Sequence, residues 1–131
     1  MLDYLEEEGL DKNTLIIYTS DQGFYLGEHG WYDKRFMYEE SYRMPMLMQL
    51  PDQIKAGITS DALLMNLDFA PTMLTFAGLP IPADMQGKSF QNIATSGKGK
   101  LRDAAYYHYF EFPGVHAVKR HYGIRTDRYK L

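Results

Sequence analysis

Cysteine is absent from this sequence of 131 residues, which rules out a fold braced by disulfide bonds. No apolar run approaches the ~20 residues that a membrane-spanning helix needs. The N-terminal stretch, Met-Leu-Asp-Tyr-Leu-Glu-Glu-Glu, lacks the basic-then-apolar order of a secretory signal. Basic charge is also not in excess, because the formal net charge is −3, and a nucleic-acid partner is therefore disfavoured. We expect a globular chain without a membrane span.

The residues that are present are those of an ordinary globular domain. Apolar residues make up 45% of the chain and charged residues 24%, and the length suits one domain with its own core. The 11 Tyr and 7 Phe are best explained by core packing. Residues 122–131 read Tyr-Gly-Ile-Arg-Thr-Asp-Arg-Tyr-Lys-Leu, a strand-like alternation that is still running where the sequence stops. We therefore interpret the chain as a piece of a larger protein.

Polar side chains follow a short apolar run at residues 15–19, which is typical of a buried strand. Asp21 and Gln22 come directly after this run, and Gly23 allows the backbone to turn sharply. A carboxylate beside an amide oxygen suits a hard cation, and ligands in α/β proteins gather where strands end. The simpler alternative is a solvated turn in which Asp21 makes an Asx-type hydrogen bond.

Alternation of strand and helix signals along the chain predicts the α/β class. The predicted elements are a helix closed by Gly9, a buried strand, a long loop, a short helix, a second strand parallel to the first and a longer helix capped by Asp68: residues 2–8, 15–19, 21–34, 35–42, 46–50 and 60–78. In the short helix, Arg43 is expected to pair with Glu39 or Glu40.

The character of the sequence changes after the last predicted helix. Residues 95–100, Thr-Ser-Gly-Lys-Gly-Lys, predict an exposed loop. Residues 104–112 and 122–131 are rich in aromatic residues with a period of two, and they predict an antiparallel pair. We therefore divide the chain into the C-terminal part of an α/β lobe, residues 1–94, and the start of a smaller antiparallel β subdomain, residues 95–131.

Several motifs in order carry a resemblance to a known family. They are Ser-Asp-Gln-Gly, Leu-Gly-Glu-His-Gly, Asp-Lys-Arg and Tyr-Glu-Glu, at residues 20–23, 26–30, 33–35 and 38–40. This order and spacing resemble the C-terminal part of sulfatases, members of the alkaline-phosphatase-like superfamily. The Asp-Lys-Arg variant is most similar to sulfatases that act on 6-sulfated N-acetylglucosamine in glycosaminoglycans and mucins.

The resemblance implies a role for each matching residue. Asp21 and Gln22 match ligands of a divalent cation, usually calcium, and Lys34 matches the lysine that holds the sulfate oxygens. His29 is either a general acid toward the leaving sugar oxygen or a brace for its loop. His116 and His121, in a basic run, either recognise the sugar substrate or belong to a solvated turn.

One part of the family's machinery has no counterpart in this sequence. The Cys/Ser-x-Pro-x-Arg motif, whose first residue is converted to the formylglycine nucleophile, does not occur here. The resemblance therefore implies that the nucleophile belongs to a preceding part, that the parent enzyme is secreted or periplasmic, and that this chain alone is inactive. An incomplete sheet would also expose apolar faces, which favours self-association of the isolated chain.

Two other functions remain open at this point. The first is a phosphatase or phosphodiesterase of the same superfamily, because phosphate and sulfate share a tetrahedral geometry. The second is a binding module that uses Asp21 and Lys34 to hold an anion or a carbohydrate without turning it over.

Overall fold

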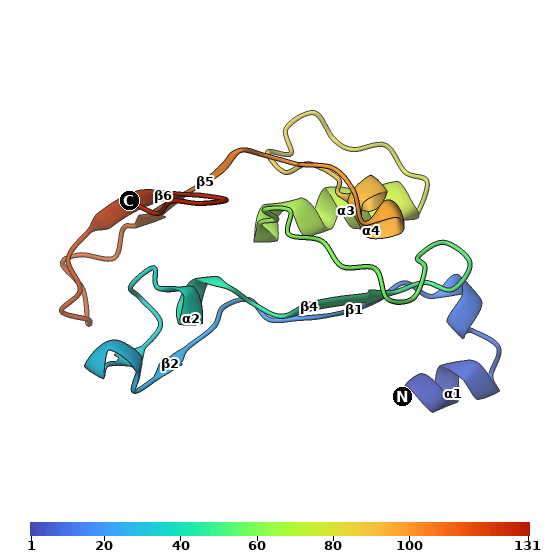
Figure 1. Cartoon of the computed structure of the whole chain (residues 1–131), viewed down its shortest axis with the longest axis horizontal. Helices are drawn as coiled ribbons and strands as arrows, with labels where there is room; N and C mark the ends of the chain where they lie inside the picture. Colours follow the sequence, from blue (N-terminus) through green and yellow to red (C-terminus); the bar gives the residue numbers. More distant parts are fainter. The chain divides into compact units, whose positions relative to one another are not determined.

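The computed structural model describes residues 1–131 as two compact units, each assembled from two separate stretches of chain (Figure 1). Unit 1 comprises Met1–Tyr18 and Leu47–Arg102, and unit 2 comprises Thr19–Met46 and Asp103–Leu131. The predicted domains, residues 1–94 and 95–131, are domains of the parent protein and differ from these two units. The predicted domain division stays a prediction. None of the helices combines the length and the apolar character that crossing a bilayer requires.

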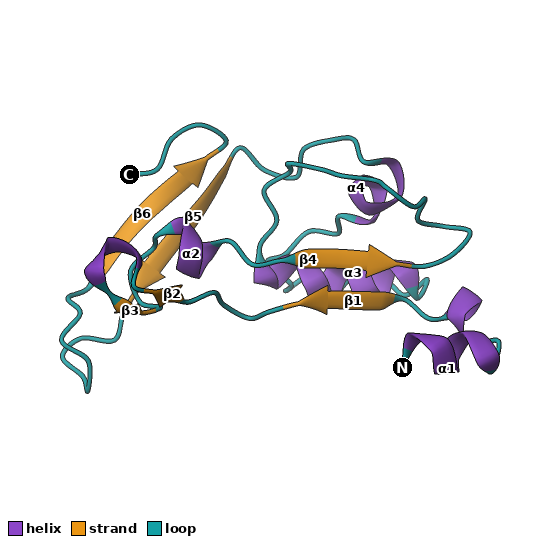
Figure 2. Ribbon diagram, turned by 60° about the horizontal axis from the view of Figure 1, so that its bottom comes forward, coloured by secondary structure: helices purple, strands orange, loops and turns teal.

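The two predicted buried strands are present and are hydrogen-bonded to each other. β1 (Ile16–Thr19) and β4 (Met46–Gln49) begin and end within one residue of their predicted limits. Their arrows point in opposite directions in Figure 2, so the pair is antiparallel and the expected parallel direction is wrong. A parallel pair needs a crossover that returns the chain to the end where it started. Between β1 and β4 the chain forms only short elements and no crossover helix, and β4 runs back alongside β1.

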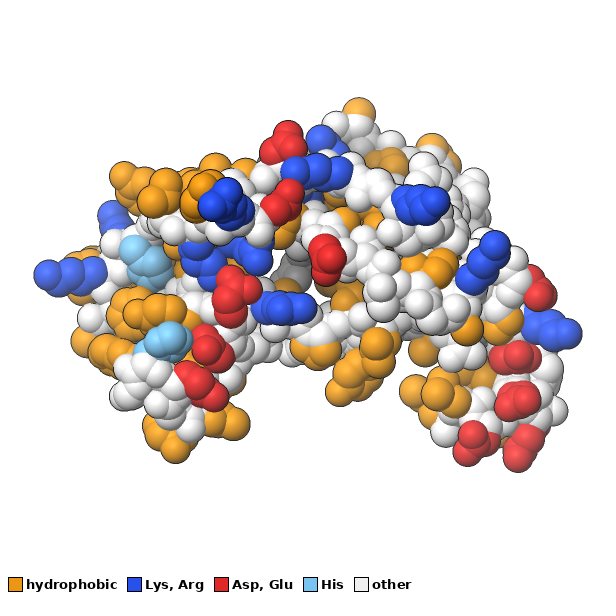
Figure 3. Space-filling view, in the orientation of Figure 1, with side chains coloured by type: hydrophobic (Ala, Val, Ile, Leu, Met, Phe, Trp, Pro, Cys, Tyr) orange, Lys and Arg blue, Asp and Glu red, His pale blue; other side chains and the backbone are white.

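The N-terminal helix has the predicted form. α1 (Leu2–Glu7) is followed by Gly9, whose φ of 67° is the left-handed conformation expected just past a helix C-terminus. The 3-10 turn η1 (Asp11–Asn13) then leads into β1. Acidic side chains gather over α1 on the face shown in Figure 3, so this surface of the helix is a solvated one.

Unit 1 has its core where the longest helix meets a second one. The elements there are η3 (Asn66–Asp68), α3 (Phe69–Phe76) and α4 (Gln91–Ser96). Thr72 of α3 is fully buried, and its hydroxyl donates to the Asp68 carbonyl at 2.7 Å and accepts from the Phe90 N–H at 3.0 Å. The last residues of α4 occupy positions that were expected to be loop.

Asp68 links the beginning of α3 to distant parts of unit 1. It stands at the predicted N-cap position, but its carboxylate accepts the N–H groups of Met65 and Lys88, at 2.8 and 3.0 Å, and the guanidinium of Arg102. Burial of the Asp68 carboxyl would raise its pKa, but the hydrogen bonds from Arg102 and the two N–H groups outweigh this, and the pKa of Asp68 lies below its usual value.

Unit 2 contains short elements and one longer hairpin. The short elements are β2 (Tyr25–Leu26), the 3-10 turn η2 (Glu28–Gly30), β3 (Tyr32–Asp33) and α2 (Glu39–Tyr42). β5 (Ala104–Tyr109) and β6 (His121–Thr126) pair along their whole length, from Ala104 opposite Thr126 to Tyr109 opposite His121. The predicted antiparallel pair is therefore confirmed.

Two local predictions for unit 2 need correction. The stretch expected to be one long loop folds into the antiparallel pair β2–β3. The helix expected at 35–42 has only the single turn of α2, because Tyr38 before it is extended, with φ −74° and ψ 161°. The extended stretch allows the Phe36 N–H to donate to the hydroxyl of Tyr25, a side chain with no exposed surface, at 2.8 Å.

Candidate active-site segment

The two predicted cation ligands lie just beyond β1, in unit 2. The Ser20 hydroxyl donates to the Gln22 carbonyl at 2.8 Å and approaches Asp21 Oδ1 at 3.4 Å, which shapes the turn. Gln22 Nε2 donates to the Lys34 carbonyl at 2.6 Å. This bond ties the beginning of the loop to its end. Since the amide nitrogen of Gln22 faces that carbonyl, its Oε1 is the atom available to a cation.

Gly23 is required here by a close approach of two backbones. Its N–H donates to the Ser41 carbonyl in α2 at 3.0 Å. A Cβ at this position would stand 2.0 Å from the Glu40 carbonyl oxygen, a distance that no side chain can occupy. The sequence predicted a sharp turn at Gly23, whereas the structure shows that the absent side chain lets the loop dock on α2.

Lys34 is exposed, and its ammonium group makes no hydrogen bond or ion pair in the structure. Its neighbours are engaged. The guanidinium of Arg35 contacts Asp33 Oδ1 and also donates to His116 Nε2 at 2.5 Å. His116 is thus joined to the Asp-Lys-Arg motif, 81 residues away in the sequence, through its Nε2. Lys34 is left as a cation whose charge is available to an anion.

His29 lies in a strained turn and has two partners. Its φ of 57° is a left-handed conformation, uncommon outside glycine and frequent at functional sites. The imidazole stacks on the Tyr38 ring, with centroids 3.9 Å apart, and its Nε2 lies 3.2 Å from Glu40 Oε2. The backbone N–H of Glu40 itself and the bond to His29 lower the pKa of the Glu40 carboxyl. These contacts are the ones that the bracing role of His29 requires.

His121, the first residue of β6, lines an open groove. Its Nδ1 donates a hydrogen bond to the Lys119 carbonyl at 2.9 Å, and its Nε2 is buried without a hydrogen-bond partner. The imidazole stacks against Phe36 and Tyr109, with ring centroids 5.6 and 5.3 Å apart. The groove has a volume of about 410 Å³, and Lys119, Arg120 and Lys130 also contribute to its lining.

Arg43 was expected to pair locally with Glu39 or Glu40, and this prediction is wrong. Glu39 binds Lys130 and Arg125 from the far end of the chain instead, whereas Glu40 binds His29. The bond from Lys130 lowers the pKa of Glu39. The sequence around Glu39 does not indicate these pairs, because Lys130 and Arg125 are far away along the chain and are of residue types common on any surface.

The residues of this chain fit one side of a cation site. Asp21 and Gln22 provide two adjacent oxygen donors, whereas calcium takes about 6–8. No group of three or more His, Cys, Asp or Glu side chains comes together closely enough to hold a metal ion. The donor chemistry therefore suits a hard cation only if further ligands come from outside this chain.

Comparison with known proteins identifies the fold and the family. The family model described as "N-sulphoglucosamine sulphohydrolase, C-terminal" matches residues 27–131. An N-acetylglucosamine-6-O-sulfatase of Bacteroides thetaiotaomicron is 58% identical over 135 residues, which cover 100% of this chain and 24% of the relative. Arylsulfatase K of Rattus norvegicus is 34% identical over 96% of this chain and 23% of the relative.

Solved structures agree with these sequence relatives. A protein in complex with its substrate D-glucosamine-2-N,6-O-disulfate superposes with a TM-score of 0.93 at 59% identity, over 99% of this chain and 27% of that chain. A phosphonate monoester hydrolase from Silicibacter pomeroyi superposes with a TM-score of 0.84 at 26% identity, over 99% of this chain and 28% of that chain.

The fold is thus the α/β fold of the alkaline-phosphatase-like hydrolases, with small antiparallel sheets, and the predicted fold class is confirmed. The chain belongs to the sulfatase family. It spans about a quarter of the length of the curated relatives that it matches, 24% and 23% of the two named above.

Proposed function

We propose that this chain forms the C-terminal part of a sulfatase that hydrolyses the 6-O-sulfate ester of N-acetylglucosamine-type sugars in glycosaminoglycans or mucins. The observation that carries the proposal is the 58% identity, over the whole chain, to an N-acetylglucosamine-6-O-sulfatase. The site geometry supports it, because a free ammonium group and two oxygen donors share one loop closed by the bond from Gln22 to the Lys34 carbonyl.

Each site residue has a proposed role. Asp21 and Gln22 Oε1 would hold a divalent cation, most simply Ca²⁺, together with ligands outside this chain. The cation, when bound, supplies positive charge that lowers the repulsion between a sulfate ester and a nucleophile. Lys34 would hold the sulfate oxygens as a compact point charge. His29, engaged by Tyr38 and Glu40, would brace the loop rather than transfer a proton.

The substrate sugar is proposed to contact the groove at His121. The aromatic rings that line the groove suit the apolar face of a sugar, and Nε2 of His121 is an unpaired acceptor that a sugar hydroxyl would reach only if the imidazole turns toward the groove. His116 would act through Arg35, with which it shares a hydrogen bond. His121→Phe preserves a ring for stacking and removes Nε2, so it should raise KM about 3- to 10-fold, the effect of losing one neutral hydrogen bond.

The nucleophile is proposed to be a formylglycine supplied by another part of the complete protein, because this sequence has no Cys/Ser-x-Pro-x-Arg motif. The isolated chain is then expected to be inactive and, with its apolar faces uncovered, to self-associate. A secreted or periplasmic location is proposed for the complete protein, since one relative is the extracellular sulfatase SULF-1 homolog of Drosophila melanogaster.

A phosphoester-type activity is the second candidate, because a phosphonate monoester hydrolase shares this fold. The complete protein should be incubated with 6-O-sulfated and 3-O-sulfated N-acetylglucosamine and with a phenylphosphonate monoester, and the released sulfate or phenol measured. We expect the highest kcat/KM on the 6-O-sulfate. A higher value on the phosphonate would overturn the sulfatase assignment, and saturable binding without release from any ester would favour a binding module.

A further inference from the structure

The last residues of this chain are held firmly against β6. After β6 the chain turns back, and the Thr126 N–H donates to the Tyr129 carbonyl at 2.7 Å. Ile124 and Leu131 exchange backbone hydrogen bonds of 3.0 and 3.1 Å. The returning residues therefore lie along β6 as a short additional strand, and the backbone of Lys130, between two bonded residues, has a fixed position.

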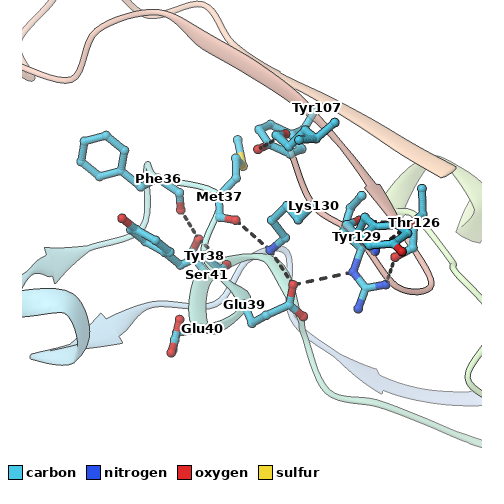
Figure 4. A network of polar contacts seen from close by, with 12 residues as sticks. Phe36, Met37, Tyr38, Glu39, Glu40, Ser41, Tyr107, Thr126, Tyr129 and Lys130 are labelled. Carbon is cyan, nitrogen blue, oxygen red and sulfur yellow. Dashed lines mark hydrogen bonds and ion pairs between the residues drawn. The ribbon is translucent and has the colours of Figure 1, made fainter.

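From this position the Lys130 ammonium reaches the segment that follows Lys34 (Figure 4). It donates to the Met37 carbonyl at 2.9 Å and pairs with Glu39 Oε1, and it lies 5.3 Å from the centroid of the Tyr42 ring. Nε of Arg125, on β6, lies 3.7 Å from the same Glu39 oxygen. Cations from two neighbouring strands thus converge on the first residue of α2.

Residues 36–42, here called the docking segment, are also bound to the loop that carries the candidate site. The Ser41 carbonyl accepts from Gly23 N–H at 3.0 Å, next to Gln22. On the other side, Glu40 contacts His29 at 3.2 Å. The docking segment therefore lies between the site loop and the β5–β6 hairpin, and its position determines how these two parts face each other.

We propose that Lys130 and Glu39 are positioning residues, which fix the docking segment and thereby align Lys34 with the groove at His121. This inference rests on the proposed function. Glu39 is 46% exposed, and a pair of this kind contributes little to folding stability. The pair of Lys130 and Glu39 instead affects the position of the docking segment. A displacement of about 1 Å can cost about 100-fold in rate when a reacting group must be aligned.

The test uses the complete protein with three variants: Lys130→Met, Lys130→Arg and, as a matched control, Arg128→Met. Arg128 lies in the same turn, but its guanidinium contacts only the neighbouring Tyr129 ring, at 5.2 Å from the centroid. On the 6-O-sulfated sugar we expect Lys130→Met to lower kcat about tenfold, a partial loss of alignment. Because Lys130 also lines the groove at His121, a rise in KM with unchanged kcat would indicate a direct contact with the sugar and overturn the positioning role. Lys130→Arg should recover much of kcat, and Arg128→Met should match the wild type.

Backbone hydrogen exchange gives a readout that does not depend on turnover. The amides of residues 36–42 should exchange faster in Lys130→Met than in the wild type and in Arg128→Met, while the melting temperature stays within about 2 °C. Unchanged exchange in this segment, or unchanged kcat in an active enzyme, overturns the positioning role. If the wild type hydrolyses no ester while the exchange difference is seen, the proposed function fails and the structural link between Lys130 and the docking segment stands.

Discussion

The two units of this chain use their polar side chains differently. Unit 1 contains no histidine, and its most deeply buried charged group, Asp68, has no exposed surface and is bound by a guanidinium and two N–H groups. Unit 2 contains all four histidines, an ammonium group without a partner at Lys34 and a buried nitrogen without a partner at His121. On the face shown in Figure 3, pale blue histidine side chains lie among both acidic and basic side chains.

This difference separates residues that support folding from residues that can serve chemistry. A buried charge with every partner in place has no bonding capacity left for a ligand, and removing one of its partners lowers the free energy of unfolding. An exposed polar group contributes little to folding and keeps that capacity, whereas a buried polar group without a partner lowers stability but also keeps it. Substitutions should therefore reduce stability in unit 1 and activity in unit 2, and the predictions below test this division in the complete protein.

The largest effect is expected at Arg102 in unit 1. Arg102→Met leaves the carboxylate of Asp68 buried beside an apolar side chain, and removing one partner of a buried pair costs about 3–5 kcal/mol. The free energy of unfolding, measured by denaturant titration, should fall by this amount. Protein that remains folded should keep the kcat of the wild type. A large loss of kcat in fully folded protein would contradict the division between the units.

Lys34→Ala should produce the next largest effect, and on activity alone. Loss of one well-placed electrostatic donor costs about 100-fold in kcat/KM. Lys34→Arg should restore only part, because a planar guanidinium is larger and would displace the ester. Stability should be unchanged, since the side chain is exposed. Lys55→Ala, an exposed lysine of unit 1, is the matched control, and wild-type kinetics for Lys34→Ala would remove Lys34 from the site.

Gly23→Ala should blur the division, because Gly23 connects the site loop to α2 by backbone contact. The added Cβ would meet the Glu40 carbonyl oxygen, and overpacking of this kind costs about 1–3 kcal/mol. We expect both a lower melting temperature and a lower kcat. Gly114→Ala is the control, since the neighbour there is the Glu111 side chain, which can move away. A fully active and stable Gly23→Ala protein would mean that the two backbones do not touch.

The last prediction concerns the pH dependence of the Asp68–Arg102 pair. The folded-state pKa of Asp68 is below its usual value of 3.8, so the stabilisation is present above that value and is lost as pH falls through the lower, folded-state pKa. Unfolding titrations of wild type and Arg102→Met should therefore differ most above pH 4 and converge in acid. A stability difference that stays constant down to pH 2 would show that Asp68 does not titrate as described.

Sequence reasoning succeeded where the signal is local. Apolar runs predicted β1 and β4, period-two aromatics predicted the β5–β6 hairpin, and Gly9 marked the end of α1. The ordered motifs at 20–43 predicted the family, which the comparisons confirm. The metal, sulfate and sugar roles of Asp21, Gln22, Lys34, His29, His116 and His121 stay predictions, to be tested by the variants above.

The errors in side-chain pairing have a common physical origin, because the true partners are distant along the chain. Arg43 was expected to pair with Glu39 or Glu40, but Lys130 binds the carboxylate of Glu39, and Lys130 also binds Met37, 93 residues earlier in the sequence. Asp68 was assigned the role of a helix cap, but the guanidinium of Arg102 takes part of its carboxylate. Charged side chains pair with whichever opposite charge the fold brings near, and local spacing does not contain that information.

The sequence by itself determined the longer helices and strands, the family and the identity of the polar residues on the loop after β1, because periodicity and motif order are properties of neighbouring residues. The tertiary structure alone decided the direction of β1 relative to β4, the docking of Gly23 on α2, the link between Arg35 and His116, and the convergence of Lys130 and Arg125 on Glu39. These contacts join residues that are distant along the chain, so they form only when folding brings the ends of long loops together. The entropic cost of closing those loops is offset by packing throughout the fold and not by the contacts alone.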